Sequence, residues 1–174
     1  GVGTPHIING QFQDLFAVFG GAGSTLSLII AMLFFCRSKR ITELGKLSLI
    51  PGIFGINEPI IFGLPMVLNP VMVVPFILTP LFNIVVSYTS MAMKLVPITN
   101  GVTIPWTTPP VISGFLATDW RGAVLQIVLI IAGVFIYMPF IKAMDKQYLA
   151  DEANAVEVAS NDDLDLDSLS FDDL

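Results

Sequence analysis

Three long runs of apolar residues limit what this chain can fold into. Leu15–Cys36 and Leu64–Tyr88 contain 22 and 25 residues without a charge, and Gly122–Ile141 contains 20. A helix of about 20 apolar residues spans the roughly 30 Å hydrocarbon core of a bilayer. The sequence therefore predicts an all-α membrane protein with about three transmembrane helices.

The distribution of charge agrees with this prediction. Only 13% of residues are charged, against about 25% in soluble domains. The net charge of −6 comes from the last segment, since nine of the fourteen acidic residues lie in Asp151–Leu174. We find no basic patch of the kind that binds nucleic acid.

Basic residues flank the first and last runs, and their positions predict sidedness. Excess Lys and Arg next to spanning helices mark the cytoplasmic side. Three spans place six basic residues on one side and two on the other; the six are Arg37, Lys39, Arg40, Lys46, Lys142 and Lys146, and the two are Lys94 and Arg121. We therefore expect a multi-pass protein of the cytoplasmic membrane with its C-terminal tail in the cytoplasm.

Prolines recur at five-residue steps in the second run, at Pro65, Pro70, Pro75 and Pro80. Each one removes a helical hydrogen bond. We expect a segmented span whose joints are satisfied by polar side chains such as Asn69 and Thr79.

Two further segments are too short and too interrupted to span a bilayer. Gly52–Gly63 and Thr99–Thr118 contain prolines, glycines and polar residues within apolar sequence. Such backbone survives at membrane depth only where protein or a water-filled cavity surrounds it. We expect two re-entrant hairpins, with an interfacial helix over Ile41–Ile50 before the first.

Glu58 lies inside the first of these segments, in the run Asn57-Glu58-Pro59. A carboxylate at membrane depth costs about 2.5–3.5 kcal/mol, so it suggests a function. Pro59 suits the first turn of a helix, which places Asn57 and Glu58 at a helix N-terminus. Two structural alternatives remain: Glu58 caps the helix, or it pairs with Lys46.

Trp106 lies in the second segment, beside Thr107 and Thr108. An indole ring can stack against the apolar face of a sugar ring. The alternative is an interfacial anchor, which is the usual position of Trp in membrane proteins. Composition alone leaves both open.

Other candidate features favour structural roles. Gly20 with Ser24, and Gly23 with Ser27, are small residues four apart that permit close helix packing. His6 suits a loop histidine without an assigned role. With one His and one Cys far apart in the sequence, we expect no metal site and no internal disulfide.

Asp151–Leu174 differs in composition from the rest of the chain. Its many acidic residues predict an acidic, disordered tail. Alternating acidic and apolar residues would also allow docking on a basic partner.

Three motifs resemble one family of membrane proteins. They are GINEPIIFGLPMVLNPVMVVPFILTPLFN (Gly55–Asn83), GGAGSTLSL (Gly20–Leu28) and IPWTTPPVISGF (Ile104–Phe115). Together they resemble the membrane-embedded IIC component of bacterial sugar phosphotransferase systems, in the lactose/cellobiose/diacetylchitobiose branch. The resemblance covers residues 1–150 and implies the C-terminal part of the IIC sugar-transport domain. We therefore expect a fragment, whose missing N-terminal half would form a homodimer.

The resemblance implies a permease that moves a β-linked disaccharide across the membrane. Its partners would be lipid, the IIB subunit that donates phosphate from a cysteine, and IIA acting through IIB. Glu58 matches the residue that binds the sugar hydroxyl and is a candidate general base, and Asn57 and Trp106 match residues lining the same site. No cofactor is expected, and neither Cys36 nor any other residue should carry phosphate. The family's other key residue, a histidine in a Gly-Ile-His-Gly-like loop, has no match in this chain, because the residues around His6 are different.

Two other functions remain open from the sequence. One is an ion-coupled secondary sugar transporter with Glu58 as the proton carrier. The other is a membrane-anchored binding protein that acts through the acidic tail. The identity of the disaccharide is not determined.

Overall fold

The computed structural model describes residues 6–64, 66 and 68–168, with side chains as far as Val156. Every regular element within these residues is helical, which confirms the all-α prediction. They are α1 (Gly10–Phe12), the π-helix η1 (Gln13–Ala17), the 3₁₀ helix η2 (Ala22–Ser24), α2 (Thr25–Phe35), α3 (Lys39–Ile53), α4 (Glu58–Gly63), α5 (Pro70–Ala92), α6 (Ile112–Ala117) and α7 (Trp120–Ser168).

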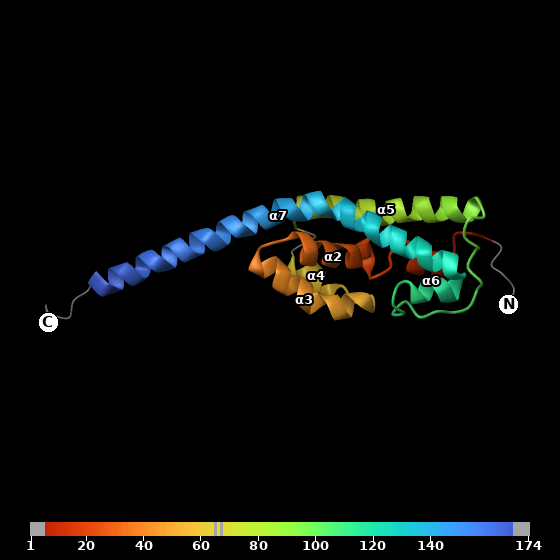
Figure 1. Cartoon of the computed structure of the whole chain (residues 1–174), viewed down its shortest axis with the longest axis horizontal. Coiled ribbons are helices and arrows are strands. Elements are labelled where there is room, and N and C mark those ends of the chain that lie inside the picture. The colour runs from red at the N-terminus through yellow and green to blue at the C-terminus, as the bar shows by residue number, and fades with distance from the viewer. Residues whose placement is uncertain (1–5, 65, 67, 169–174) are drawn as a thin grey trace.

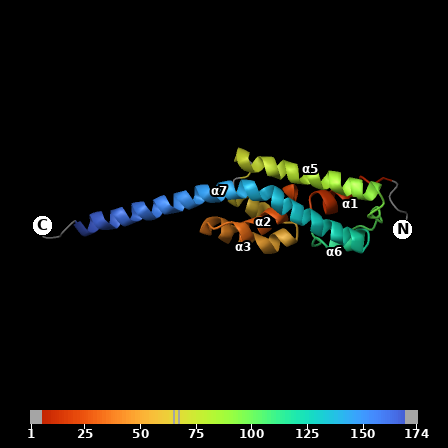
Figure 2. The same ribbon diagram turned by 45° about the horizontal axis from the view of Figure 1, so that its top comes forward.

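Three helical stretches are long and apolar enough to cross a membrane: Gly10–Phe35, Pro70–Ala92 and Trp120–Val156. They correspond to the three predicted spans. α5 and α7 run side by side along the long axis of the molecule (Figures 1 and 2).

Two apolar clusters hold the helices together. In the first, α2 packs on α7, where Leu28, Met32 and Tyr137 are fully buried. In the second, Phe12 and Phe16 pack against the beginning of α7. The outward faces of α5 and α7 are also apolar, with exposed side chains such as Val85 and Phe135, as lipid-facing helices require.

The first span is not one regular α-helix, and the prediction of a span over Leu15–Cys36 did not include its break. Between Ala17 and Thr25 the chain leaves the α-helical conformation, and four residues adopt positive φ: Gly20, Gly21, Gly23 and Ser24. Glycine within a helix costs about 1 kcal/mol relative to alanine, and this segment contains three. The run GGAGS therefore interrupts the helix. It also permits the close packing that we predicted, since a Cβ on Gly23 would clash with the Phe76 ring of α5.

Side chains satisfy the carbonyls that this break leaves without helical partners. The bonds join Ser24 Oγ and Asn83 Nδ2 to the Ala17 carbonyl, Thr25 Oγ1 to that of Gly20, Asn57 Nδ2 to that of Ala22, and Tyr137 Oη to that of Gly23, at 2.6–3.1 Å. Unpaired backbone groups cost several kcal/mol in a membrane. The break is thus fixed in place by α4, α5 and α7.

α5 is continuous, so the segmented span predicted from the prolines is wrong over Pro70–Ala92. Asn69 accepts the N–H of Val71 at 3.0 Å and caps the helix, and the Thr79 hydroxyl donates to the carbonyl of Pro75 at 2.8 Å. Asn69 thus satisfies a backbone group at the start of α5, as we predicted, whereas the Thr79 hydroxyl binds a carbonyl within a continuous helix and fills no joint. One lost hydrogen bond per proline costs less than a chain break exposed to lipid. Pro65 lies outside the described residues.

α3 runs back along α2 and includes the segment predicted to form an interfacial helix (Figure 1). Its packing along a span does not confirm an interfacial position for Ile41–Ile50. The chain then reverses at 54–57 into α4, and an irregular stretch over 97–111 leads into α6. Both predicted hairpins are therefore chain reversals, and their depth in the membrane stays a prediction.

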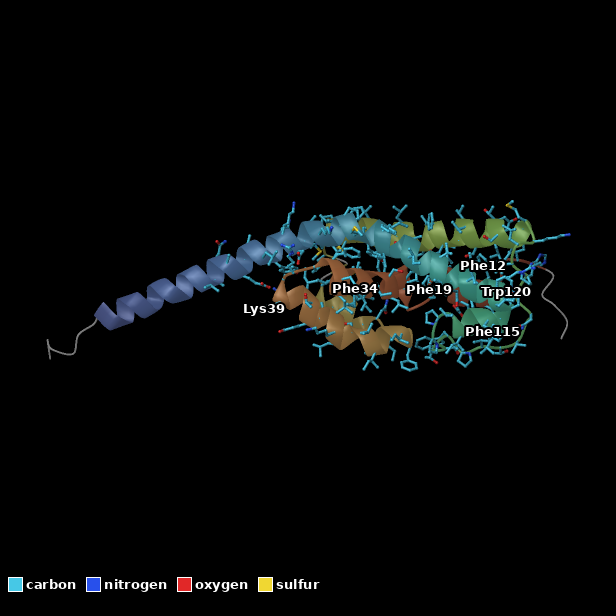
Figure 3. All side chains as sticks on the ribbon, in the orientation of Figure 1. Phe12, Phe19, Phe34, Lys39, Phe115 and Trp120 are labelled. Atoms are coloured by element: carbon cyan, nitrogen blue, oxygen red, sulfur yellow. The ribbon has the colours of Figure 1, made fainter. Side chains whose placement is uncertain are left out.

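Four of the six basic residues predicted on one side, Arg37, Lys39, Arg40 and Lys142, lie near the corner between α2 and α3. The N–H groups of Arg37 and Ser38 donate to the carboxylate of Asp145 at 2.8–3.1 Å, and the Arg40 guanidinium lies 4.8 Å from the centre of the Tyr148 ring. Lys39 and Trp120 lie at opposite ends of the helical body (Figure 3).

α7 continues to Ser168 and extends well beyond the other helices (Figure 1). The disorder predicted from Asp151 is therefore not confirmed over residues 151–168, which are helical. Alanine-rich sequence without glycine or proline after Pro139 favours continuation of the helix. Residues 169–174 lie outside the described part of the chain.

Candidate functional site

One cavity of about 330 Å³ contains all three residues that the sequence singled out. Its lining consists of Asp14, Val18, Gly21, Ala22, Gly55, Asn57, Glu58 and Trp106. These residues come from η1, the broken part of the first span, the turn before α4 and the loop before α6. Asn57 and Trp106, far apart in sequence, are thus brought to the same place.

Asn57 joins the turn before α4 to the broken helix. Its side chain is 7% exposed, and its amide donates to the Ala22 carbonyl at 2.9 Å. A Cβ on Gly21 would lie 2.6 Å from the Asn57 side chain, and Gly21 has φ +96°. Only glycine permits this approach. Asn57 is therefore held rigidly, with its side-chain oxygen available as an acceptor in the cavity.

Gly55 joins the same turn to the Trp106 loop. It has φ +82°, and a Cβ there would lie 3.2 Å from Cε3 of the Trp106 ring and 3.3 Å from the Trp106 carbonyl oxygen. The indole thus lies directly against the turn that leads into Glu58. Because 60% of its surface remains exposed, Trp106 can present a ring face to a ligand.

Glu58 is the first residue of α4, and its side chain is exposed at the cavity. The sequence had suggested a carboxylate surrounded by apolar interior, and the described residues do not enclose it. α4 has only six residues. The groups that the cavity offers to a ligand are therefore mostly polar side chains, and not the N–H groups at the start of a helix. Lys46, the alternative partner, is not among the residues that line the cavity.

Asp14 is a second carboxylate in this cavity, and we did not single it out from the sequence. It lies in η1, exposed, immediately before the first apolar run. A charge at the end of a predicted span suggests an ordinary membrane boundary. The sequence signal that could have indicated Asp14 is the run GGAGS. The break there turns the chain so that Asp14 and Gly21 line the same cavity.

The cavity is suited to a neutral ligand rich in hydroxyl groups. Two carboxylates and an amide oxygen offer acceptors, and an aromatic ring offers an apolar face. A phosphate group would meet two like charges, which disfavours anionic ligands. The volume lies at the lower end of the range for small-molecule sites, roughly 300–1,000 Å³. His6 and Cys36 are absent from the lining.

Comparisons with known proteins agree with the motifs. The family described as "Phosphotransferase system, EIIC" matches residues 1–80. The chain is 45% identical over 150 residues to the lichenan permease IIC component of Bacillus subtilis (strain 168), covering 85% of this chain and 33% of the relative. It is 50% identical over 150 residues to the cellobiose-specific EIIC component of Geobacillus stearothermophilus, again covering 85% and 33%.

The fold also matches a solved structure. The crystal structure of the transporter ChbC, the IIC component of the N,N'-diacetylchitobiose-specific phosphotransferase system, superimposes with a TM-score of 0.84 at 43% identity. The match covers 87% of this chain and 35% of that one. The chain thus spans about a third of the length of these relatives. It belongs to the EIIC family of the phosphotransferase system.

Proposed function

We propose that this chain is the sugar-binding part of a permease of the phosphoenolpyruvate-dependent phosphotransferase system. Residues 1–150 form the C-terminal part of the IIC transport domain, and residues 151–174 form an acidic tail. The permease moves a β-linked disaccharide of the cellobiose, lactose or diacetylchitobiose type. The names of the relatives, which include cellobiose and diacetylchitobiose components, support this class of substrate.

One observation carries the proposal: Asn57, Glu58 and Trp106 line the same cavity. Glu58 binds the sugar hydroxyl that is to be phosphorylated and serves as general base, since an ionised carboxylate can accept its proton. Trp106 stacks on a sugar ring, and Asn57 accepts a hydroxyl hydrogen bond. Asp14 supplies a further acceptor in the same cavity.

Phosphate comes from a partner protein. The cavity repels anions, so this chain does not hold the phosphoryl donor. The IIB subunit carries the phosphoryl group on a cysteine and receives it from IIA. Homodimer formation belongs to the part of the permease outside this chain, which also encloses the exposed face of Glu58.

The protein lies in the cytoplasmic membrane of a bacterium. The end that carries Arg37, Lys39, Lys142 and Lys146 faces the cytoplasm, and the tail follows it there. The turn at 54–57 and the loop at 97–111 both reach the cavity from re-entrant hairpins.

A transport assay with the complete permease tests this function. Vesicles supplied with phosphoenolpyruvate and the soluble partners should accumulate phosphorylated cellobiose, lactose or diacetylchitobiose, and a proton uncoupler should not reduce the rate. Accumulation of unmodified sugar that stops on uncoupling would instead establish the ion-coupled transporter, which the relatives reported above do not support.

A further inference from the structure

Gln126 is a buried polar residue in the apolar part of α7. Its side chain is fully buried and lies outside the cavity lining. Nevertheless it makes hydrogen bonds to two other parts of the chain, through its oxygen to the beginning of α6 and through its nitrogen to η1. A fully satisfied buried amide fixes the relative positions of the elements that it joins.

The oxygen of Gln126 binds the N-terminus of α6. Oε1 accepts the N–H of Val111 at 2.6 Å and the N–H of Gly114 at 3.0 Å, with the Ser113 hydroxyl at 3.4 Å. The first N–H groups of a helix lack partners within it. Val111 makes no side-chain cap, so Gln126 caps α6 from a neighbouring helix.

The nitrogen of Gln126 binds η1. Nε2 donates to the Leu15 carbonyl at 2.6 Å and to the Ser113 hydroxyl at 3.1 Å. Leu15 directly follows Asp14, which lines the cavity. One side chain thus connects the segment that carries Asp14 to the hairpin that carries Trp106.

Val111 shows why this connection is needed. It has φ +75° and ψ −52°, a region that a β-branched residue occupies rarely. Such conformations are strained and persist only where the surroundings enforce them. The short bond from the Val111 N–H to Gln126 enforces the turn that connects α6 to the Trp106 loop.

We propose that Gln126 is a positioning residue for the sugar site, which holds the Trp106 hairpin and the Asp14 segment at a fixed separation across the cavity. This inference rests on the proposed function. α7 contributes no residue to the cavity lining, and the inference gives this helix a role in binding affinity.

The test uses Gln126→Met in the complete permease, because methionine keeps the length of the side chain and removes both polar groups. Equilibrium affinity for cellobiose, lactose or diacetylchitobiose, whichever the permease transports, should fall at least about tenfold. Ile141→Ala is the matched control, since Ile141 is fully buried on the same helix but packs in the first apolar cluster, away from η1. It should lower thermal stability without a comparable loss of affinity.

A second substitution separates positioning from general destabilisation. Glycine adopts positive φ without strain, so Val111→Gly should make the turn less dependent on Gln126. We expect the double variant Gln126→Met/Val111→Gly to recover part of the lost affinity. Where Gln126→Met fails to insert, Gln126→Asn keeps an uncharged amide but is one carbon shorter, so it cannot reach both Val111 and Leu15, and it should bind about two- to fivefold more weakly.

Wild-type affinity in Gln126→Met or Gln126→Asn, a loss no larger than that of Ile141→Ala, or no recovery in the double variant would overturn the inference. Trp106→Ala distinguishes this failure from failure of the proposed function. If Trp106→Ala weakens binding and Gln126→Met does not, only the positioning role is lost. If neither substitution weakens binding, the sugar site itself is wrong.

Discussion

Single residues give the cavity its selectivity, because its side chains offer acceptors and few donors. Glu58 and Asp14 are both exposed there, and the amide of Asn57 already donates to the Ala22 carbonyl. A ligand that donates many hydrogen bonds and carries no negative charge satisfies this arrangement. Sugars meet both conditions, and their C–H groups suit the indole face of Trp106.

Trp106→Ala tests the aromatic part of the site. Loss of the ring should weaken disaccharide binding about three- to tenfold, as expected for one aromatic contact, with normal membrane insertion. Equilibrium binding to the complete permease measures the effect. Trp120→Ala is the control, since Trp120 is equally exposed (62%) but lies beside Arg121 at the beginning of α7 and does not line the cavity. Equal affinities in both variants would restore the interfacial-anchor interpretation of Trp106.

The sequence indicated a cavity residue where a polar or aromatic side chain interrupted an apolar segment. Glu58 and Trp106 stand out because a charge and a ring with adjacent hydroxyls interrupt apolar sequence. Asp14 and Gln126 do not, since one ends a span and the other is a single amide within a long apolar run. Their proposed roles depend on which segments lie together in the folded chain, and the spacing of residues along the sequence does not reveal this.

At the scale of elements, the cavity depends on a break in the first span. The unwound segment Val18–Ser24 exposes carbonyls that Asn57 and Tyr137 bind, and Asn83 binds the Ala17 carbonyl directly before it. Hydrophobicity predicted the three spans correctly because length and apolarity suffice for that. It did not locate the break, since glycine and serine suit both helix packing and unwinding. For α5 the error was the opposite one: we predicted breaks at the prolines, but a chain break exposed to lipid costs more than the hydrogen bond that each proline removes.

Asp145 fixes the corner between α2 and α3 against α7. Its carboxylate is 6% exposed and accepts the N–H groups of Arg37 and Ser38. Asp145→Asn removes the charge and should lower the free energy of unfolding by about 1–3 kcal/mol, the range for hydrogen bonds to charged groups. Thermal unfolding of the permease in lipid would measure this loss. Asp151→Asn, at an exposed position on the same helix, should have little effect, and equal stability of the two variants would contradict the role of Asp145.

At the scale of the whole molecule, charge separates the two ends and the cavity lies along the body between them. The positions of Lys and Arg predict which end faces the cytoplasm, and that orientation stays a prediction. The sequence did not predict that α7 continues helically to Ser168, since acidic composition alone indicates disorder. The chain spans about a third of the length of its relatives.

The most direct measurement is the equilibrium affinity of the complete permease for its disaccharide after Glu58→Gln. Glutamine keeps the volume and removes the charge, so affinity should fall about 10- to 100-fold, as expected for one hydrogen bond to a charged group. Glu43→Gln, an exposed carboxylate on α3 near the basic end, should bind as the wild type does. Unchanged affinity in Glu58→Gln would contradict the assignment of this cavity as the sugar site.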